Sequence, residues 1–224
     1  SYGGGYYDAF VAKLSGDLTN LLAVTYLGGS SQDYISSVIM AADGNVYVSG
    51  KTLSSDFPTT TGAYDNSYND TSSNHDAFVA KLSGNLTSLL AATYLGGSTD
   101  DSAGSTKTDS NGNVYVSGKT TSINFPVTSG AYDTSFNKEN SYDAFVSKFS
   151  GDLTSLLAST YLGGTDYEYG YRLTIDSKGN IVVTGQTWSS DFPTTAGAYN
   201  TSFQGVTDAF VSKLSEDLTT LLAS

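Results

Sequence analysis

Three carboxylates stand at equivalent places in a repeated sequence. They are Asp33, Asp101 and Glu168, separated by 101 − 33 = 68 and 168 − 101 = 67 residues. If the turns that carry them surround one opening, the carboxylates could converge on a hard cation such as Ca²⁺, which takes several oxygen ligands. Alternatively, each carboxylate accepts hydrogen bonds from the backbone amides of its own turn. The second interpretation is favoured, because turn carboxylates are common and one of the three is Glu.

The chain has few residues suited to catalysis. His75 is the only histidine, and the corresponding positions in the other repeats are Tyr142 and Thr207. No Ser-His-Asp set, phosphate-binding loop or zinc-ligand spacing is present. A glycosidase would need two carboxylates of distinct roles, and nothing in the sequence singles out such a pair. The sequence therefore predicts a protein that is not an enzyme and that requires no cofactor, with Ca²⁺ as the one candidate ion.

A few residues could instead serve recognition or modification. Arg172 and Trp188 are large side chains that occur once each, both in the third repeat. They are the candidates for a face that binds a glycan or a surface protein. The N-glycosylation pattern Asn-x-Ser/Thr occurs at three further positions, which are Asn69, Asn85 and Asn200.

Composition excludes several classes of partner. The net charge of −12 repels phosphate backbones and anionic lipid headgroups, so nucleic acid is not an expected partner. No apolar run approaches the ~20 residues that span a bilayer, so no membrane insertion is expected. The chain has no cysteine, and it is rich in Gly and Tyr, with 24 and 17 residues. This composition is closer to that of secreted or cell-surface proteins than to that of cytosolic enzymes.

The chain is built from a sequence repeat of about 67 residues. Tyr-Leu-Gly-Gly begins at Tyr26, Tyr94 and Tyr161, and each copy is followed by a Gly-Asn-Val-Tyr-Val-like segment. Fixed-period self-similarity indicates a repeat architecture. We therefore expect a single domain, 1–224, with a half-repeat at 1–29 and full repeats at about 30–97, 98–164 and 165–224. A second marker, Asp-Ala-Phe-Val, occurs four times, beginning at Asp8, Asp76, Asp143 and Asp208.

Each repeat predicts four short strands, given in the first copies by 35–42, 45–52, 76–82 and 89–95. Val, Thr and Tyr favour strands, and glycines bound each run. Residues 8–14 and 21–27 add a leading pair, so 3 × 4 + 2 = 14 strands are expected. The Asp43-Gly44 pair predicts a two-residue type I′ hairpin, which needs positive φ at both central residues. Four-stranded antiparallel units repeated along a chain are typical of β-propeller blades.

A segment of 20 to 23 residues links the second and third strands of each repeat. Every copy contains Phe-Pro followed by Gly-Ala-Tyr, beginning at Phe57, Phe125 and Phe192. Aromatic side chains at matched places suggest that they dock on the sheet and hold the segment in place, although stacking on sugars is the alternative. The lysines that follow Asp-Ala-Phe-Val, such as Lys13, could form ion pairs with these aspartates across neighbouring units.

The combined motif resembles the SBBP (β-propeller) repeat. Tyr-Leu-Gly-Gly-Ser is followed by Asp-x-x-Gly-Asn-Val-Tyr-Val-x-Gly-x-Thr, Asp-Phe-Pro-x-Thr and Asp-Ala-Phe-Val-x-Lys-Leu, best preserved at 94–120 and 191–214. The similarity covers essentially the whole chain. Two departures are Ala41, where the other copies have Asp109 and Asp176, and Asn124, where they have Asp. The resemblance implies a large secreted or cell-surface microbial protein of a family mostly without assigned activity.

The resemblance also implies the position of each strand, from 35–42 at the inside of a blade to 89–95 at its outside. The leading pair then lacks its two inner strands, and an open sheet edge favours pairing. Either the chain is cut from a longer array, or a neighbouring copy supplies the missing strands. Head-to-tail contacts of the latter kind produce rings or filaments. The preferred prediction is a non-enzymatic extracellular structural module that self-associates. The alternative is a glycan- or protein-binding module that uses the Phe-Pro face.

Overall fold

The computed structural model describes residues 4, 6–69, 74–137 and 141–224. Over these residues the chain forms fourteen β-strands and no helix, so it contains no helix long and apolar enough to cross a membrane. The strands are β1 (Ala9–Leu14), β2 (Leu21–Leu27), β3 (Asp33–Met40), β4 (Val46–Thr52), β5 (Asp76–Leu82), β6 (Leu89–Leu95), β7 (Asp101–Thr108), β8 (Val114–Thr120), β9 (Asp143–Phe149), β10 (Leu156–Leu162), β11 (Glu168–Ile175), β12 (Ile181–Thr187), β13 (Asp208–Leu214) and β14 (Leu221–Ala223).

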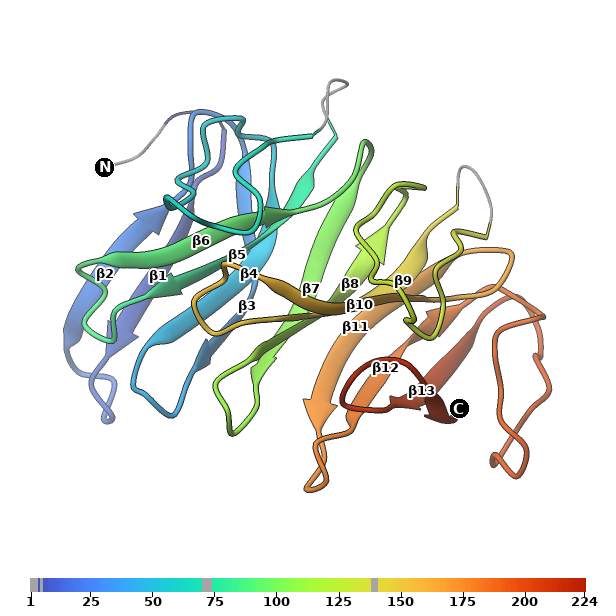
Figure 1. The fold of residues 1–224 in the computed structure, drawn as a ribbon. Coiled ribbons are helices and arrows are strands. Elements are labelled where there is room, and N and C mark those ends of the chain that lie inside the picture. Colours follow the sequence, from blue (N-terminus) through green and yellow to red (C-terminus); the bar gives the residue numbers. More distant parts are fainter. Residues whose placement is uncertain (1–3, 5, 70–73, 138–140) are drawn as a thin grey trace.

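The strands form three four-stranded antiparallel blades and one half-blade (Figure 1). Blade 1 is β3–β6, blade 2 is β7–β10, blade 3 is β11–β14, and the half-blade is β1–β2. The blades stand in a row, with the two chain ends at opposite ends of it. The first strands of consecutive blades contact one another, β3 with β7 and β7 with β11. The all-β propeller-type repeat and the strand order within each blade agree with the sequence-based prediction.

Hydrophobic clusters fill the spaces between consecutive blades. On β4, Val46 and Val48 point toward the half-blade, where they join Val11 and Leu27. Tyr47 points the other way, into the cluster shared with blade 2. A third cluster joins blades 2 and 3. Because β4 and β8 are buried on both faces of their blades, their side chains are apolar in both directions rather than alternating.

The hairpins between the first and second strands differ from the prediction. The amide of Gly44 donates to the Ala41 carbonyl, and the amide of Ala41 donates to the Asn45 carbonyl, both at 2.9 Å. Positive φ occurs at Gly44 but not at Asp43. The connection is thus a three-residue loop, a type I turn followed by a left-handed glycine, rather than a two-residue type I′ turn. The inner strands also begin two residues earlier than expected, at Asp33 in blade 1.

Consecutive blades are also joined through the turn between the third and fourth strands. In blade 2 this turn contains Leu153, whose φ of 58° is in the left-handed region although it is not glycine. Its side chain is buried in the cluster between blades 1 and 2. Its carbonyl accepts the amide of Tyr64, and the neighbouring Gly151 carbonyl accepts the hydroxyl of Tyr47, at 2.9 and 2.7 Å. Burial and cross-blade hydrogen bonds thus hold the unfavourable backbone conformation.

The Phe-Pro segments cover the outer edges of the blades. In blade 1, Thr60 donates its amide to the Ala92 carbonyl and Tyr94 donates its amide to the Asp65 carbonyl, at 3.1 Å each. This pairing hides the edge of β6 from other chains. Phe57 is buried in the blade, as predicted for docking, and Phe125 is buried in the same way in blade 2. The third copy differs, because Tyr199 is fully exposed.

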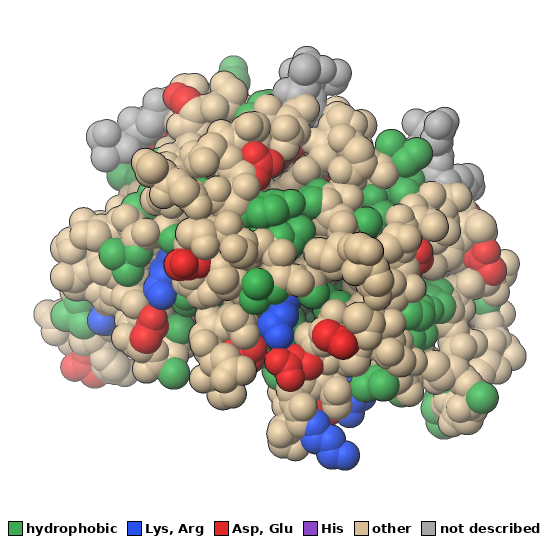
Figure 2. Space-filling model, in the orientation of Figure 1, with side chains coloured by type: hydrophobic (Ala, Val, Ile, Leu, Met, Phe, Trp, Pro, Cys, Tyr) green, Lys and Arg blue, Asp and Glu red, His purple; other side chains and the backbone are tan. Residues whose placement is uncertain are grey.

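The lysines of the third strands do not pair with the Asp-Ala-Phe-Val aspartates, contrary to the prediction. Lys81 and Lys213 lie beside the hairpin carboxylates of their own blades, with Lys81–Asp43 at 3.1 Å and Lys213–Asp176 at 2.5 Å. Lys148 instead lies closest to Glu216 of blade 3, at 3.0 Å. In blade 1 the hairpin carboxylate is Asp43, two residues after Ala41, which occupies the position of Asp176 in blade 3. Asp43 thus supplies the carboxylate that Ala41 lacks. On the face shown in Figure 2, basic side chains are few and acidic ones lie near them.

Candidate functional site

The three repeated carboxylates are the first residues of the inner strands, and all three are buried. Asp33 accepts the amide of Gly29 at 2.9 Å and the hydroxyls of Thr52 and Ser54 at 2.5 and 3.0 Å. The other two carboxylates have the same kind of partners, namely Gly97 and Ser122 for Asp101, and Gly164 and Thr187 for Glu168. Each carboxylate therefore closes the Gly-Gly turn that leads into its own blade.

A second carboxylate, from the preceding blade, approaches each of them. A methyl group added to Gly96 would lie 2.8 Å from an oxygen of Asp76 and 2.8 Å from an oxygen of Asp101. At Gly163 the corresponding oxygens belong to Asp143 and Glu168, at 3.1 and 2.7 Å. We call these sets acid pairs. Since Asp76 lies in blade 1 and Asp101 in blade 2, each pair spans a junction between blades.

Burial raises the pKa values of Asp101, Asp143 and Glu168, and a nearby carboxylate adds to the effect in each case. Burial is the main cause for Asp101, whose pKa rises to about 8, and Asp76 adds to the effect. The pKa of Asp143 also rises to about 8, through burial and the nearby Glu168. One oxygen of Asp143 is buried and has no hydrogen-bond partner among the described residues. Two ionised carboxylates beside each other in a buried site are unfavourable, so the pairs Asp76–Asp101 and Asp143–Glu168 are each expected to retain a proton.

The three carboxylates Asp33, Asp101 and Glu168 do not meet at a common opening. Each lies at a different junction, bound to its own turn. Within the part of the chain that the structure describes, no group of three or more His, Cys, Asp or Glu side chains is arranged to hold a metal ion. The contacts are those of the capping interpretation, in which the carboxylates order the turns.

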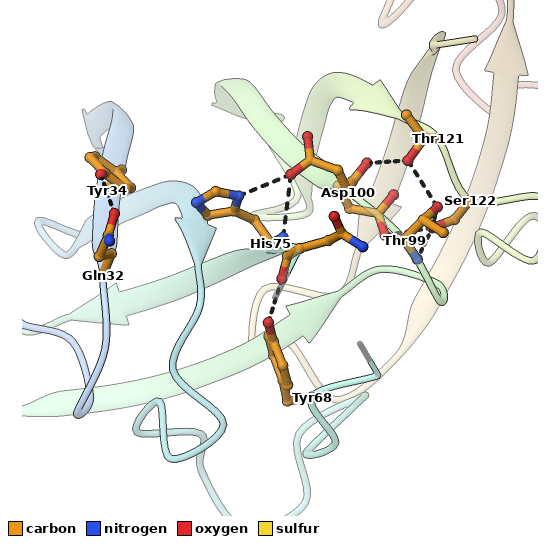
Figure 3. A network of polar contacts seen from close by, with 10 residues as sticks. Gln32, Tyr34, Tyr68, His75, Thr99, Asp100, Thr121 and Ser122 are labelled. Carbon is orange, nitrogen blue, oxygen red and sulfur yellow. Dashed lines mark hydrogen bonds and ion pairs between the residues drawn. The ribbon is translucent and has the colours of Figure 1, made fainter. Parts of the chain in front are cut away.

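Beside the acid pair of blades 1 and 2 lies a polar network that includes His75 (Figure 3). Asp100 accepts a hydrogen bond from the amide of His75 at 3.3 Å and contacts its Nδ1 at 2.9 Å. Burial opposes ionisation of Asp100, but the contacts from His75 outweigh it and hold the pKa of Asp100 below its usual value. The Nε2 atom of His75 is buried and has no hydrogen-bond partner among the described residues.

At the junction of blades 2 and 3 the corresponding place holds an aromatic cluster. It consists of Tyr142, Tyr167, Tyr169 and Trp188, with adjacent ring centroids 5.3 to 6.4 Å apart. The ammonium of Lys119 lies 4.1 Å from the Tyr142 ring and 4.5 Å from the Tyr169 ring. Burial lowers the pKa of Lys119. The cluster offers flat faces and one cation, a combination suited to stacking and polar contact with a ligand.

The two residues predicted for a binding face make different contacts. Trp188 belongs to the aromatic cluster. Arg172 instead donates from Nη1 to the carbonyls of Gly104 and Tyr171, at 3.1 and 3.0 Å, and thereby links the inner strands of blades 2 and 3. The acid pairs were not predicted, although one signal was available. Asp8 and Asp33, Asp76 and Asp101, and Asp143 and Glu168 are each separated by 25 residues.

The three candidate glycosylation asparagines are exposed. Asn69 is described, but Asp70 and Thr71 of its motif lie outside the described residues. Asn85 accepts hydrogen bonds from the amide and hydroxyl of Thr87 through Oδ1. Asn200 lies on the wall of an open cavity in blade 3.

Comparison with known proteins identifies the repeat. Residues 159–193 match the family model of the SBBP beta-propeller repeat. The matched segment runs from the end of β10 through β11 and β12 to the third Phe-Pro. No curated protein matches the chain. The predicted resemblance is thereby confirmed over these residues, and the match describes a repeat and its fold.

Proposed function

We propose that this β-propeller repeat chain is a non-enzymatic structural module of a secreted or cell-surface assembly, in which copies associate head to tail. The observation that carries the proposal is a pair of exposed apolar faces, one at each end of the row of blades. Both faces are equivalent to surfaces that are buried between blades inside the molecule. The extracellular setting is supported by the composition and by the three exposed glycosylation candidates.

The first face belongs to the half-blade and β3. Phe10 of the half-blade points to where a preceding blade would stand, and Val38 of β3 points to where the inner strands that the half-blade lacks would stand. Phe10 is 63% exposed, whereas its counterparts Phe78 and Phe145 are fully buried. Val38 is 59% exposed, whereas its counterpart in blade 2, Thr106, is fully buried against blade 1. In addition, β1 pairs only with β2, so its second edge has no strand partner among the described residues.

The second face is on blade 3 and points to where a following blade would stand. Its centre is Val211, which is 63% exposed, whereas its counterparts Val79 and Val146 are fully buried between blades. The two faces differ from each other, and consecutive blades inside the chain show how such faces fit. When unlike faces of identical copies bind each other, every added copy leaves one face of each kind free. Assembly then continues into a filament unless the copies close into a ring.

Association should be weakened by a charge on the first face. We expect Val38→Asp to shift the midpoint of association to a concentration about tenfold higher or more, which corresponds to 1.4 kcal/mol. Light scattering over a concentration series, with electron microscopy of the same samples, measures this shift. Moderate salt should be present, since the net charge of −12 opposes self-association at low ionic strength.

Ile123→Asp is the matched control, because Ile123 is exposed but lies on a Phe-Pro segment rather than on either face. It should associate like the unaltered chain. A chain that stays monomeric at all concentrations, with both variants folded, would contradict the proposal.

A second candidate function is glycan recognition, and the aromatic cluster at the junction of blades 2 and 3 is the observation that favours it. Sugar rings stack on aromatic faces, and Lys119 would favour an anionic sugar. Titration of Trp188 fluorescence with a panel of glycans, with and without Ca²⁺, tests this candidate. A saturable fluorescence change would support glycan recognition, provided that Lys119→Met loses the change with anionic glycans and keeps it with neutral ones. An unchanged fluorescence signal across the whole panel would exclude this function.

A further inference from the structure

The residue before Asp-Ala-Phe-Val carries a ring in three of the four copies, namely Tyr7, His75 and Tyr142. The Tyr7 ring centroid lies 5.8 Å from that of Tyr34, which is on the first strand of blade 1. The Tyr142 ring centroid lies 5.4 Å from that of Tyr169, which is on the first strand of blade 3. His75 lies between Tyr34 and Asp100 (Figure 3), with its ring centroid 6.0 Å from that of Tyr34. Rings therefore line one side of the row of blades, across the three junctions.

Two lysines lie among these rings, at equivalent positions on the second strands of blades 1 and 2. Lys51 is opposite Tyr34 in the sheet, and its ammonium lies 5.4 Å from the centroid of that ring. In blade 2 the residue opposite Lys119 is Ser102, which has no ring. The ammonium of Lys119 instead reaches the ring of Tyr169 across the junction, at 4.5 Å. We call this set the ring-lysine belt: Tyr34, Lys51, His75, Lys119, Tyr142 and Tyr169.

Neither of the two belt lysines forms an ion pair with a carboxylate in the described part of the chain. The lysines of the third strands differ, as Lys148 shows by lying 3.0 Å from Glu216. Burial lowers the pKa of Lys119, Asp100 partly opposes this shift, and repulsion from Lys51 adds to it. An anionic ligand would offset this repulsion and gain charge-assisted hydrogen bonds from both ammonium groups without breaking an ion pair.

Further rings beside Lys119 extend the belt and are partly exposed. Tyr171 stacks on Tyr169, with ring centroids 5.9 Å apart and planes 26° apart, and it is 45% exposed. Tyr167 packs edge-on against Trp188 and is 37% exposed. Sugar rings can stack on such surfaces, while the ammonium groups beside them suit carboxylate or sulfate substituents. The belt thus offers apolar faces and positive charge side by side.

We infer that the ring-lysine belt binds an acidic glycan chain, whose anionic groups contact Lys51 and Lys119 and whose sugar rings stack on the tyrosines. The two lysines belong to different blades, so a chain of several sugars engages both, and linked contacts strengthen one another. This binding rests on the glycan recognition proposed above, and it specifies the ligand class and adds a second cation. A nucleic acid fits less well, because the net charge of −12 repels its continuous row of phosphates.

Oligosaccharides of galacturonic acid, which carry one carboxylate per sugar, test the inference directly. In isothermal titration of the whole chain in calcium-free buffer, the octasaccharide should bind about tenfold more tightly than the disaccharide, because only the longer chain reaches both lysines. Added salt should weaken this binding. The methyl-esterified octasaccharide has the same sugars without the charges, and its affinity should be lower by about tenfold.

Lys51→Met removes the second cation and keeps most of the length of the side chain. It should lower the affinity for the octasaccharide about tenfold. The affinity for the disaccharide should not change, because the short ligand is expected beside Lys119, where the rings are most numerous. Lys178→Met is the matched control, since Lys178 is exposed on the hairpin between β11 and β12, at the opposite end of the blade from Tyr169. It should bind both oligosaccharides as the unaltered chain does.

Three results would overturn the inference. Equal affinities for the two oligosaccharides, with no effect of Lys51→Met, would exclude the belt and leave glycan recognition at the aromatic cluster. No binding of any glycan would exclude both. An eight-residue oligothymidylate that binds as tightly as the octasaccharide would show that the belt is not selective for a glycan. Head-to-tail association is tested separately, because Val38 is not part of the belt, and Val38→Asp should bind the octasaccharide as the unaltered chain does.

Discussion

The free energy of unfolding is expected to fall as the pH rises from about 5 to about 8. Asp101 and Asp143 have folded-state pKa values of about 8, far above the value of 3.8 for an unfolded Asp. Between these limits the folded chain binds more protons than the unfolded chain, so raising the pH favours unfolding. The stabilisation is fully present below the unfolded pKa and is lost as the pH rises through the folded pKa.

The expected decrease is at least ~2 kcal/mol over this range, since each unit of raised pKa corresponds to about 1.4 kcal/mol. Urea unfolding, followed by circular dichroism at several pH values, measures it. The exposed carboxylates with lowered pKa values, such as Asp17 and Asp43, act in the opposite direction but titrate below about pH 4. A starting pH of about 5 therefore isolates the acid pairs.

Asp143→Asn provides the matched control for the pH profile. An amide resembles the protonated carboxyl in shape and remains neutral at every pH. The variant should therefore have a flatter profile than the unaltered chain and should be more stable at about pH 8. A stability that is constant or increases between about pH 5 and pH 8 in the unaltered chain would show that the acid pairs do not retain a proton.

A methyl group at Gly118 is expected to destabilise the fold by about 3 kcal/mol or more. Gly118 lies on β8 opposite Ala103, next to the place where the register of β7 shifts. An added Cβ would lie 2.0 Å from the Ser102 carbonyl oxygen and 2.8 Å from the Phe145 ring. Neither the backbone of β7 nor a buried ring can move without disturbing the junction, so Gly118→Ala overpacks the core.

Gly16→Ala is the control for this substitution. Gly16 has ordinary φ, and an added Cβ there would meet no atom within 4 Å. Its effect should stay within ~0.5 kcal/mol, as for most surface substitutions. Urea unfolding at one fixed pH compares the two variants. A loss of less than ~1 kcal/mol in Gly118→Ala would show that the inner strand can shift to admit a side chain.

Much of the fold could be predicted from local pattern. Alternating apolar residues and paired glycines defined the strands, and the repeated motifs defined their order within a blade. The hairpin type was predicted incorrectly, because Asp-Gly suits two kinds of turn and the choice depends on where the strands end. Since β3 already ends at Met40, the loop has three residues, and only Gly44 adopts positive φ. Asp43 therefore keeps a negative φ, which a two-residue type I′ turn would not allow.

The candidate sites were harder to predict, because they form between blades. Asp76 and Asp101 belong to different repeats, and only the packing of one blade against the next brings them together. Similarly, Lys119 lies between Tyr142 and Tyr169, which come from neighbouring blades. Nothing in one repeat alone indicates these contacts.

The cross-blade hydrogen bonds of Tyr64 and Tyr47 have a consequence for mechanical load. Each blade is bonded mainly to its immediate neighbours, so a pulling force on the two ends would detach blades in sequence rather than all at once. One detached blade of about 67 residues would release roughly 230 Å of extended chain, at ~3.4 Å per residue. A fibre of such molecules would lengthen in discrete steps under tension and dissipate energy at each step before it broke.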